Sequence, residues 1–351
     1  KKNQLKKKNQ LTTIKKITNN KWRDKDLSFL FMKSLICLAP LAGYTNVAYR
    51  NFMKKFGCDI VVSEMISDFA LYYHNEETFK MLETTTQEKP VAIQLFGGSE
   101  ESLINGLNIL QKVANYDYLD LNLGCPVNKV TKNNAGSSWL KKDRQEELFN
   151  TISHIVKVSK KPVTCKIRLG WNEEEITVVD TCKILQKAGV KMITIHGRTR
   201  SQLYSGNANY ELIKKAKESV DIPIIANGDI DTIYKAKEVL DYTKCDGIAL
   251  GRAVLGNPYL ITQIKEYLST GIILPSPDIN KQMDYLLEHY NALESLKGER
   301  VAIMEFRGIG SWYLKGFKGA KEFKVMFSLM KNKEDLLNII NKIKDNKLER
   351  I

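Results

Sequence analysis

The chain of 351 residues is long enough for one α/β barrel, which takes about 250 residues, and a smaller appended domain. Its 43% hydrophobic and 27% charged residues exclude a largely disordered chain. The formal net charge of +14 favours a polyanionic partner such as a nucleic acid. The abundance of Lys, Asn and Ile also fits an AT-biased genome, so charge alone leaves both explanations open.

The six cysteines are scattered, with no C-x-x-C pair and no Cys/His cluster at zinc spacing. Reduced thiols, a cytoplasmic location and no bound metal are therefore expected. An apolar run over 28–39 resembles a signal peptide, but Lys33 interrupts it and it continues into the turn at 40–43. No segment reaches the roughly 20 apolar residues of a membrane span, so no membrane association is expected. A stable protein partner is not predicted either.

Residues 1–25, dominated by Lys, Asn and Thr, are expected to form a basic N-terminal arm. After this arm, short apolar runs alternate with amphipathic segments. The runs are nearly continuously apolar, which is typical of strands covered on both faces in a parallel sheet. The eight predicted strands span residues 35–39, 59–63, 91–95, 118–123, 163–167, 192–196, 223–226 and 247–250.

Segments with apolar residues at helical spacing lie between the strands. Gly57 and Gly189 follow two of them, where a left-handed residue favours the end of a helix. Eight strands can close a barrel, and an open doubly wound sheet is disfavoured because no G-x-G-x-x-G follows the first strand. We therefore predict an α/β protein with a (β/α)8 TIM barrel over 26–262 and a small helical domain over 263–351. The predicted helices include 47–56, 102–113, 144–158, 176–187 and 210–218, and then 279–296, 301–314 and 333–343 in the tail.

Polar side chains stand at the C-terminal ends of most of these strands, where α/β barrels carry their functional groups. Lys166 lies in an otherwise apolar strand, and a buried ammonium needs an anionic or carbonyl partner unless it reaches solvent. Gln94 can hold the edge of a ring through its amide, or it can be a structural hydrogen bonder. The glycines at 228 and 251, with Arg252 beside the second, form either a phosphate site or two tight turns.

Cys125 follows the fourth strand and precedes Pro126, which stops the sheet and places the thiol in the barrel mouth. It could be a nucleophile, a general acid or a small buried hydrophobic residue. Asn122 and Arg168 flank it and could bond the edge of a planar heterocycle. Tyr204 could stack on such a ring, and His196 could support either a phosphate or a base; each could equally brace the barrel.

Six motifs, in order along the chain, closely resemble those of the tRNA-dihydrouridine synthases, and the bacterial B-type branch is most similar. The resemblance runs from about residue 35 to 262 and extends into the tail through SWYLKG at 311–316. The motifs are APLAG at 39–43, LDLNLGCP at 119–126 with Ala135 and Gly136 ten residues on, KIR at 166–168, HGRTR at 196–200, NGD at 227–229 and GRAVLGNP at 251–258.

This resemblance implies noncovalent FMN, NADPH (or NADH) as reductant, and tRNA as partner. A hydride would pass to C6 of a uridine, and Cys125 would protonate C5. Asn122, Arg168 and Tyr204 would meet the uracil. Leu41 stands where Met is usual and Asn46 where Asp is frequent. The implied cofactor contacts are Pro40, Leu41, Ala42, Gln94, Lys166, His196, Asn227, Gly228, Asp229, Gly251 and Arg252.

To reach the flavin, the target base must leave the RNA stack, so the protein needs a surface that binds phosphates. The helical tail is the predicted RNA-binding domain. Lysines at 315, 318, 321 and 324 stand there beside aromatic residues at 312, 313, 317 and 323. The same pattern fits a solvated face over a small aromatic core. Two other functions stay open: an FMN-dependent reductase of a small molecule, resembling dihydroorotate dehydrogenase, or a noncatalytic RNA chaperone.

Overall fold

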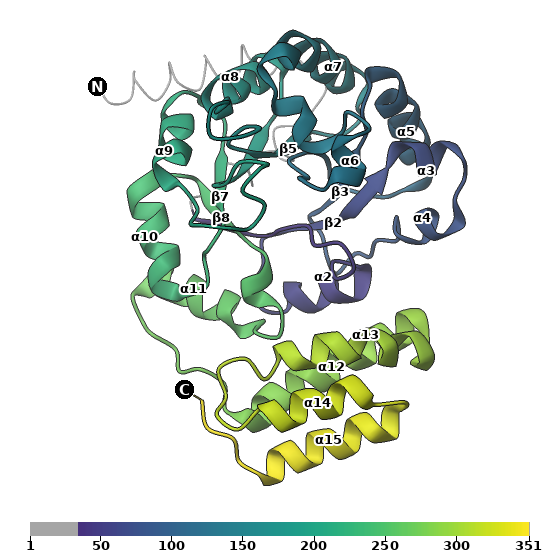
Figure 1. Ribbon diagram of the computed structural model, residues 1–351, viewed down its shortest axis with the longest axis vertical. Helices are drawn as coiled ribbons and strands as arrows, with labels where there is room; N and C mark the ends of the chain where they lie inside the picture. The colour runs from purple at the N-terminus through teal and green to yellow at the C-terminus, as the bar shows by residue number, and fades with distance from the viewer. Residues whose placement is uncertain (1–33, 351) are drawn as a thin grey trace, which may run out of the picture. The chain divides into compact units, whose positions relative to one another are not determined.

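The computed structural model describes residues 34–350, in which strands and helices alternate through a closed barrel (Figure 1). The predicted basic arm at 1–25 lies outside the described residues. Each strand pairs in parallel with the next, and β8 pairs with β1, which confirms the predicted TIM barrel. The strands are β1 (Leu35–Leu38), β2 (Ile60–Ser67), β3 (Val91–Phe96), β4 (Tyr118–Leu123), β5 (Val163–Arg168), β6 (Met192–His196), β7 (Ile224–Asn227) and β8 (Gly247–Leu250).

Helices surround the barrel because their apolar faces cover the outside of the strands. Asn46, whose role the sequence left open, caps α2 by accepting a hydrogen bond from the Tyr49 N–H at 3.1 Å. The helices of the barrel are α2 (Val47–Lys54), α3 (Asp68–Tyr72), α4 (Glu76–Lys80), α5 (Glu100–Val113), α6 (Asn128–Thr131), α7 (Gln145–Val158), α8 (Val178–Ala188), α9 (Tyr210–Glu218), α10 (Ile233–Thr243) and α11 (Tyr259–Thr270). Short 3₁₀ turns among the described residues are η2 (Gly136–Leu140), η3 (Lys142–Arg144) and η4 (Arg252–Val254).

The tail forms a second hydrophobic core, distinct from that of the barrel. The predicted domain boundary after residue 262 falls inside α11, and the loop at 271–278 separates α11 from the tail. A short helix that the sequence pattern did not predict, α14, lies in the tail. The tail helices are α12 (Ile279–Lys297), α13 (Glu299–Trp312), α14 (Lys321–Leu329) and α15 (Lys333–Asp345).

The tail is fixed to the barrel by buried polar and aromatic contacts. His289 of α12 stacks on Phe52 of α2 with ring centroids 5.4 Å apart, and it shares a 3.0 Å hydrogen bond with the Tyr313 hydroxyl. The Gln282 amide donates to the carbonyls of both Gly256 and Tyr313. Gly256 lies in the loop after β8 at φ +66°. A Cβ at this position would lie 2.2 Å from the backbone of residue 312, so only glycine allows this close approach. The loop after β8 therefore connects the barrel mouth directly to the tail.

None of the helices within residues 34–350 is both long and apolar enough to cross a membrane.

Candidate active site

The parallel register of β3 to β7 sets the polar side chains of the mouth in rows across neighbouring strands. Strand ends that are distant in sequence thereby face one another. The rows are Gln94, Asp120 and Thr164; Asn122, Lys166 and Thr194; and Arg168, His196 and Asn227. All the predicted catalytic, cofactor and substrate residues lie in the C-terminal halves of the strands or in the loops that follow them.

A hydrogen-bonded chain begins at Asp120, a buried carboxylate that the sequence analysis did not single out. Its Oδ1 accepts from Thr164 Oγ1 and its Oδ2 from Gln94 Nε2, both at 2.6 Å. Gln94 Oε1 accepts from Asn122 Nδ2 at 2.8 Å. Asn122 Oδ1 in turn accepts from the backbone N–H of Cys125 at 2.8 Å. One N–H of Gln94 is left for a ligand, because its amide nitrogen carries two.

The Cys125 side chain is only 9% exposed and packs with Val130 and Ala135. Burial raises the pKa of its thiol, while the positive charges of Arg168 and Lys166 oppose that rise. The thiol is therefore protonated at neutral pH, which suits a proton donor better than a nucleophile.

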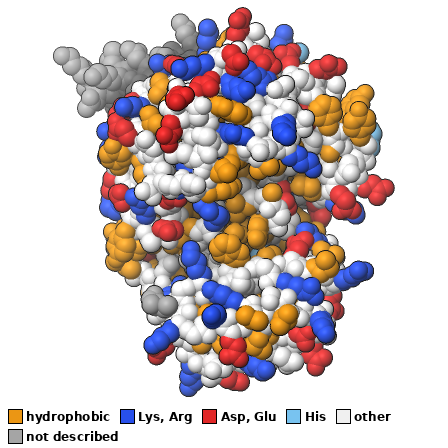
Figure 2. Space-filling model, viewed as in Figure 1, with side chains coloured by type: hydrophobic (Ala, Val, Ile, Leu, Met, Phe, Trp, Pro, Cys, Tyr) orange, Lys and Arg blue, Asp and Glu red, His pale blue; other side chains and the backbone are white. Residues whose placement is uncertain are grey.

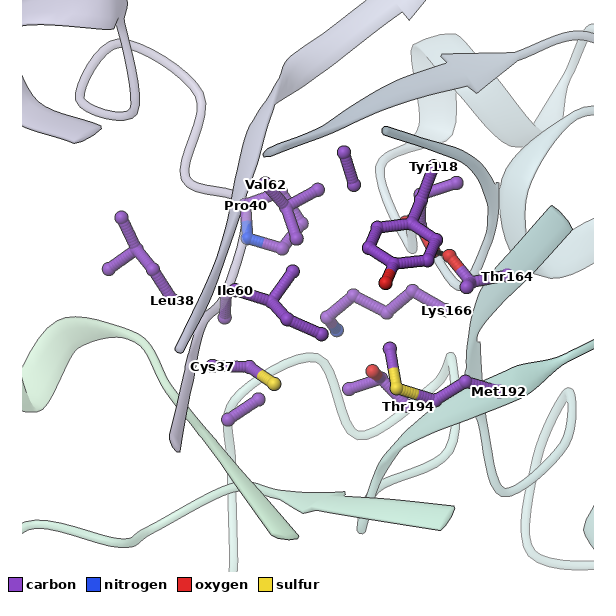
Figure 3. Close-up of a pocket in the computed structure, with 14 residues that line it drawn as sticks. Cys37, Leu38, Pro40, Ile60, Val62, Tyr118, Thr164, Lys166, Met192 and Thr194 are labelled. Atoms are coloured by element: carbon purple, nitrogen blue, oxygen red, sulfur yellow. Dashed lines mark hydrogen bonds between the residues drawn. The ribbon is translucent and has the colours of Figure 1, made fainter. Parts of the chain in front are cut away.

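Lys166 extends from β5 into a cavity inside the barrel (Figure 3). Burial and the neighbouring Arg168 charge lower the pKa of its ammonium to about 8. Among residues 34–350 no hydrogen bond or ion pair of this ammonium is found, although Asp120 also lines the cavity. The site accordingly has a half-buried cation available for an anionic or carbonyl group of a ligand.

Arg168, only 2% exposed, holds two loops at the mouth. Its Nε donates to the Gly124 carbonyl at 3.0 Å, and its Nη1 donates to the carbonyls of Thr199 and Leu203 at 2.8 and 2.7 Å. Burial lowers its pKa to about 10, so it stays charged at neutral pH. Within the described chain Nη2 makes no hydrogen bond, and it remains free for a ligand.

Tyr204 lies between two cations on the loop after β6. Its ring centroid is 4.6 Å from the Arg252 guanidinium carbon and 5.6 Å from that of Arg168, and its side chain is exposed. The His196 ring is 6.2 Å away. Burial, together with the surrounding Lys and Arg charges, lowers the pKa of His196 to about 2, so its imidazole is neutral.

Arg198, another residue that the sequence analysis did not single out, pairs with Asp229. The guanidinium donates to both carboxylate oxygens at 2.9 and 2.8 Å, and the Ala208 N–H adds a third bond. The side chain of Asp229 thus serves the protein, and the Gly228 carbonyl accepts from the Tyr210 hydroxyl at 2.6 Å. Within the described residues, the backbone N–H groups of Gly228 and Asp229 are left for a ligand. Asn227 likewise donates its side-chain amide to the Ala249 carbonyl at 2.8 Å.

The loops after β1 and β8 complete the mouth. Pro40 lines the cavity, Leu41 is half-buried and Ala42 is exposed. A Cβ at Gly251 would find its nearest neighbours only at 3.8 Å or more, so this turn leaves room beside the exposed Arg252. Together with Lys166 and Arg168, Arg252 makes the mouth strongly cationic, which fits a planar ligand that carries a phosphate.

The face that carries the barrel loops and the tail presents hydrophobic side chains near its middle, with Lys and Arg side chains scattered around them (Figure 2). A second cationic feature lies on the mouth loops, where Lys141 Nζ and Arg200 Cζ lie 4.6 and 4.5 Å from the Trp171 ring centroid. Arg200 also donates to the Asn128 side chain at 2.5 Å. Lys129 on α6 and Lys132 just after it are exposed nearby in sequence. The rim beside Cys125 is therefore basic.

Residues 37–348 match the family model described as dihydrouridine synthase. A probable tRNA-dihydrouridine synthase of Rickettsia bellii is 38% identical over 300 residues, covering 85% of this chain and 91% of that protein. The tRNA-dihydrouridine synthase B of Pseudomonas syringae pv. tomato is 36% identical over 301 residues, covering 85% and 88%.

Solved structures with a similar fold include histamine dehydrogenase from Rhizobium sp. 4-9, with a TM-score of 0.51 at 12% identity. A 2-naphthoyl-CoA reductase gives the same TM-score and identity. The matches cover 69% and 66% of this chain but about half of each solved chain, 48% and 50%. At this identity they establish the barrel fold alone.

The raised pKa of Cys125 predicts a distinctive pH profile for its alkylation by iodoacetamide. Because only the thiolate reacts, the rate should keep rising with pH beyond the ordinary thiol pKa of about 8.5. Lys166→Met removes a cation that lowers the pKa, so it should move the profile to still higher pH. Mass spectrometry of the Cys125 peptide measures both rates. A plateau already reached below pH 8.5 would contradict the assigned burial of the thiol.

Proposed function

The chain belongs to the dihydrouridine synthase family, and from this premise we propose that it reduces uridine in tRNA to 5,6-dihydrouridine. The observation that carries the proposal is the buried Cys125 thiol just after β4, whose pKa burial raises, in a mouth whose other groups are mainly cationic or neutral. Reduction of the C5–C6 bond adds a hydride at C6 and a proton at C5. The thiol is the group suited to give the proton.

FMN, when bound, would supply the hydride, and NADPH or NADH would restore it. The unpaired Lys166 ammonium and the free Gln94 N–H would hold its ring, since one can neutralise negative charge and the other can donate to a carbonyl. Arg252 and the N–H groups around Gly228 and Gly251 would hold its phosphate. Further contacts are proposed for Pro40, Leu41, Ala42, His196, Asn227 and Asp229.

The target uracil would lie beside Cys125, bonded by Arg168 Nη2 and by the Asn122 N–H that here donates to the Met65 sulfur at 3.7 Å. The Tyr204 ring would stack on the base, because its exposed face already lies at the mouth. Neutral His196 could accept or donate one hydrogen bond near both ligands. These roles place a planar heterocycle between donors on one side and the proton source on the other.

A base can reach this mouth only after leaving the tRNA stack, so the protein must grip the RNA elsewhere. Four tail lysines are exposed, and within the described chain no ion pair of theirs is found; they are Lys315, Lys318, Lys321 and Lys324. Their neighbours Tyr313, Phe317 and Phe323 are buried and form the tail core, so the tail would bind phosphates rather than stack bases. All six cysteines are free and buried, which supports a reducing, cytoplasmic location.

Cys125→Ala should keep the yellow colour of the bound flavin but lower the rate of dihydrouridine formation by about 10²- to 10⁴-fold, the usual value of a positioned acid. Cys245→Ala is the matched control, because this thiol is equally buried, 8% exposed against 9%, but precedes β8 at the opposite end of the barrel. Single-turnover assays on unmodified tRNA measure both. Full activity in the Cys125 variant would remove this residue from the reaction.

Replacing the four tail lysines by glutamine should weaken tRNA binding and flatten its salt dependence. The slope of log affinity against log salt should fall by about 0.7 to 0.9 for each phosphate that the tail no longer neutralises. The control replaces four exposed lysines elsewhere on the barrel, Lys112, Lys157, Lys160 and Lys244, so that net charge changes equally. Filter binding across a salt series measures the slopes. Equal slopes in both variants would reject the tail as the RNA-binding surface.

A further inference from the structure

We propose that Asp120 is a positioning residue that sets the place of Cys125 without touching it. It acts through Gln94 and Asn122, whose side chains link the Asp120 carboxylate to the backbone of the Cys125 turn. The hydrogen-bonding part of the proposal stands on geometry alone. Its kinetic consequence rests on the proposed function.

The direction of the hydrogen bonds in this chain is fixed at both ends. Both Asp120 oxygens accept, one from Thr164 and one from Gln94, so Gln94 turns its amide nitrogen toward Asp120 and its oxygen toward Asn122. Burial raises the pKa of the Asp120 carboxyl, while these two hydrogen bonds and the Lys166 charge oppose that rise. Asn122 must then offer nitrogen to Gln94 and oxygen to the N–H groups of Gly124 and Cys125, which can only donate. Reversing either amide would set two donors or two acceptors against each other. Asp120 therefore fixes the orientation of Gln94 directly and, through Gln94, supports the orientation of Asn122 that the two N–H groups also require.

Asn122 is the hydrogen-bond partner of both N–H groups in the Cys125 turn, at 3.1 Å for Gly124 and 2.8 Å for Cys125. The carbonyls of the same two residues are held separately, by Arg168 Nε and by the Ser137 N–H, each at 3.0 Å. Without the correct Asn122 orientation the turn would keep the hydrogen bonds to its carbonyls, but both of its N–H groups would be without an acceptor. The thiol would then no longer be held in one place.

Asp120 has a second connection that provides the matched control. Its other oxygen accepts from Thr164 Oγ1 at 2.6 Å, the same length as the bond from Gln94, and both donors are buried. Thr164→Val removes this bond but leaves the bond to Gln94. A general loosening of β4 against a neighbouring strand, β3 or β5, would follow from the removal of either bond, whereas release of the Cys125 turn should follow only from removal of the bond to Gln94.

Asp120→Asn separates orientation from charge. The asparagine oxygen can still accept from Gln94, while its amide donates to Thr164 Oγ1, since a hydroxyl both donates and accepts. The variant thus retains the hydrogen bonds that run from residue 120 to the Cys125 turn but removes the negative charge that acts on Lys166. Asp120→Leu removes both. If the leucine variant does not fold, Asp120→Ser replaces it, because a serine hydroxyl is too short to reach Gln94.

The first readout is amide hydrogen exchange in the holoenzyme, followed by mass spectrometry. Pro126 has no amide, so fragments ending at 123 and at 126 differ only by the amides of Gly124 and Cys125. We expect exchange at these amides to be about 10-fold faster in Asp120→Leu and unchanged in Asp120→Asn and Thr164→Val. This readout needs no turnover, so it remains informative if the tRNA activity is absent.

The second readout is single-turnover dihydrouridine formation. Asp120→Leu should lower the rate about 10- to 100-fold with KM for tRNA unchanged, as expected when a reacting group is misplaced. Equal exchange rates in all variants would overturn the proposal. Equal losses of rate in Asp120→Leu and Asp120→Asn would also overturn it, because they would show that Asp120 acts through its charge on Lys166. If exchange is faster in Asp120→Leu but the wild-type protein forms no dihydrouridine, the positioning role of Asp120 stands and the proposed function is rejected.

Discussion

The parallel register of the closed sheet is the constraint on which the rest of the structure depends. Because neighbouring strands keep their residues in step, Gln94 meets Asp120, Asn122 meets Lys166, and Arg168 meets His196. A shift of one residue in any of these strands would turn its polar side chains away from the mouth. The Lys166 cation, the linked Gln94 and Asn122 amides and the Cys125 turn are thus consequences of one arrangement, which the apolar contacts between the strands stabilise.

Charge in the mouth follows from the same arrangement. Lys166, Arg168 and Arg252 face the ligand side, whereas the carboxylates of Asp120 and Asp229 are each satisfied by groups of the protein. The surrounding cations and burial keep His196 neutral and leave it poorly suited to give a proton as an imidazolium. Cys125, raised in pKa by burial, keeps its proton. Burial keeps the proton on Cys125, and the hydrogen bonds to the two carboxylates leave the cations free to bind an anion. The mouth is therefore divided into an anion-binding region and a proton source.

The sequence predicted the barrel well because its strands are continuous apolar runs. It stopped β2 four residues early, since Glu64 interrupts the apolar run while the strand continues past a register shift between Val62 and Met65. It missed α14, in which the buried residues are only Phe323 and Phe327. Motifs located the mouth, but Arg198 joins Asp229 across 31 positions and Asp120 joins Gln94 across 26, and such pairings depend on the register. The signals for Asp120 were its place in the LDLNLGCP motif and its acidic side chain inside an apolar strand.

The central claim is that this mouth reduces uridine in tRNA, and it is tested most directly by mass spectrometry of unmodified tRNA incubated with the protein, FMN and NADPH. The account predicts a gain of two hydrogen atoms on a uridine of the D-loop, mapped by nuclease fragments. A protein that is yellow and oxidises NADPH but leaves the mass of every tRNA unchanged would contradict it, and would direct attention to another substrate for the same cationic mouth.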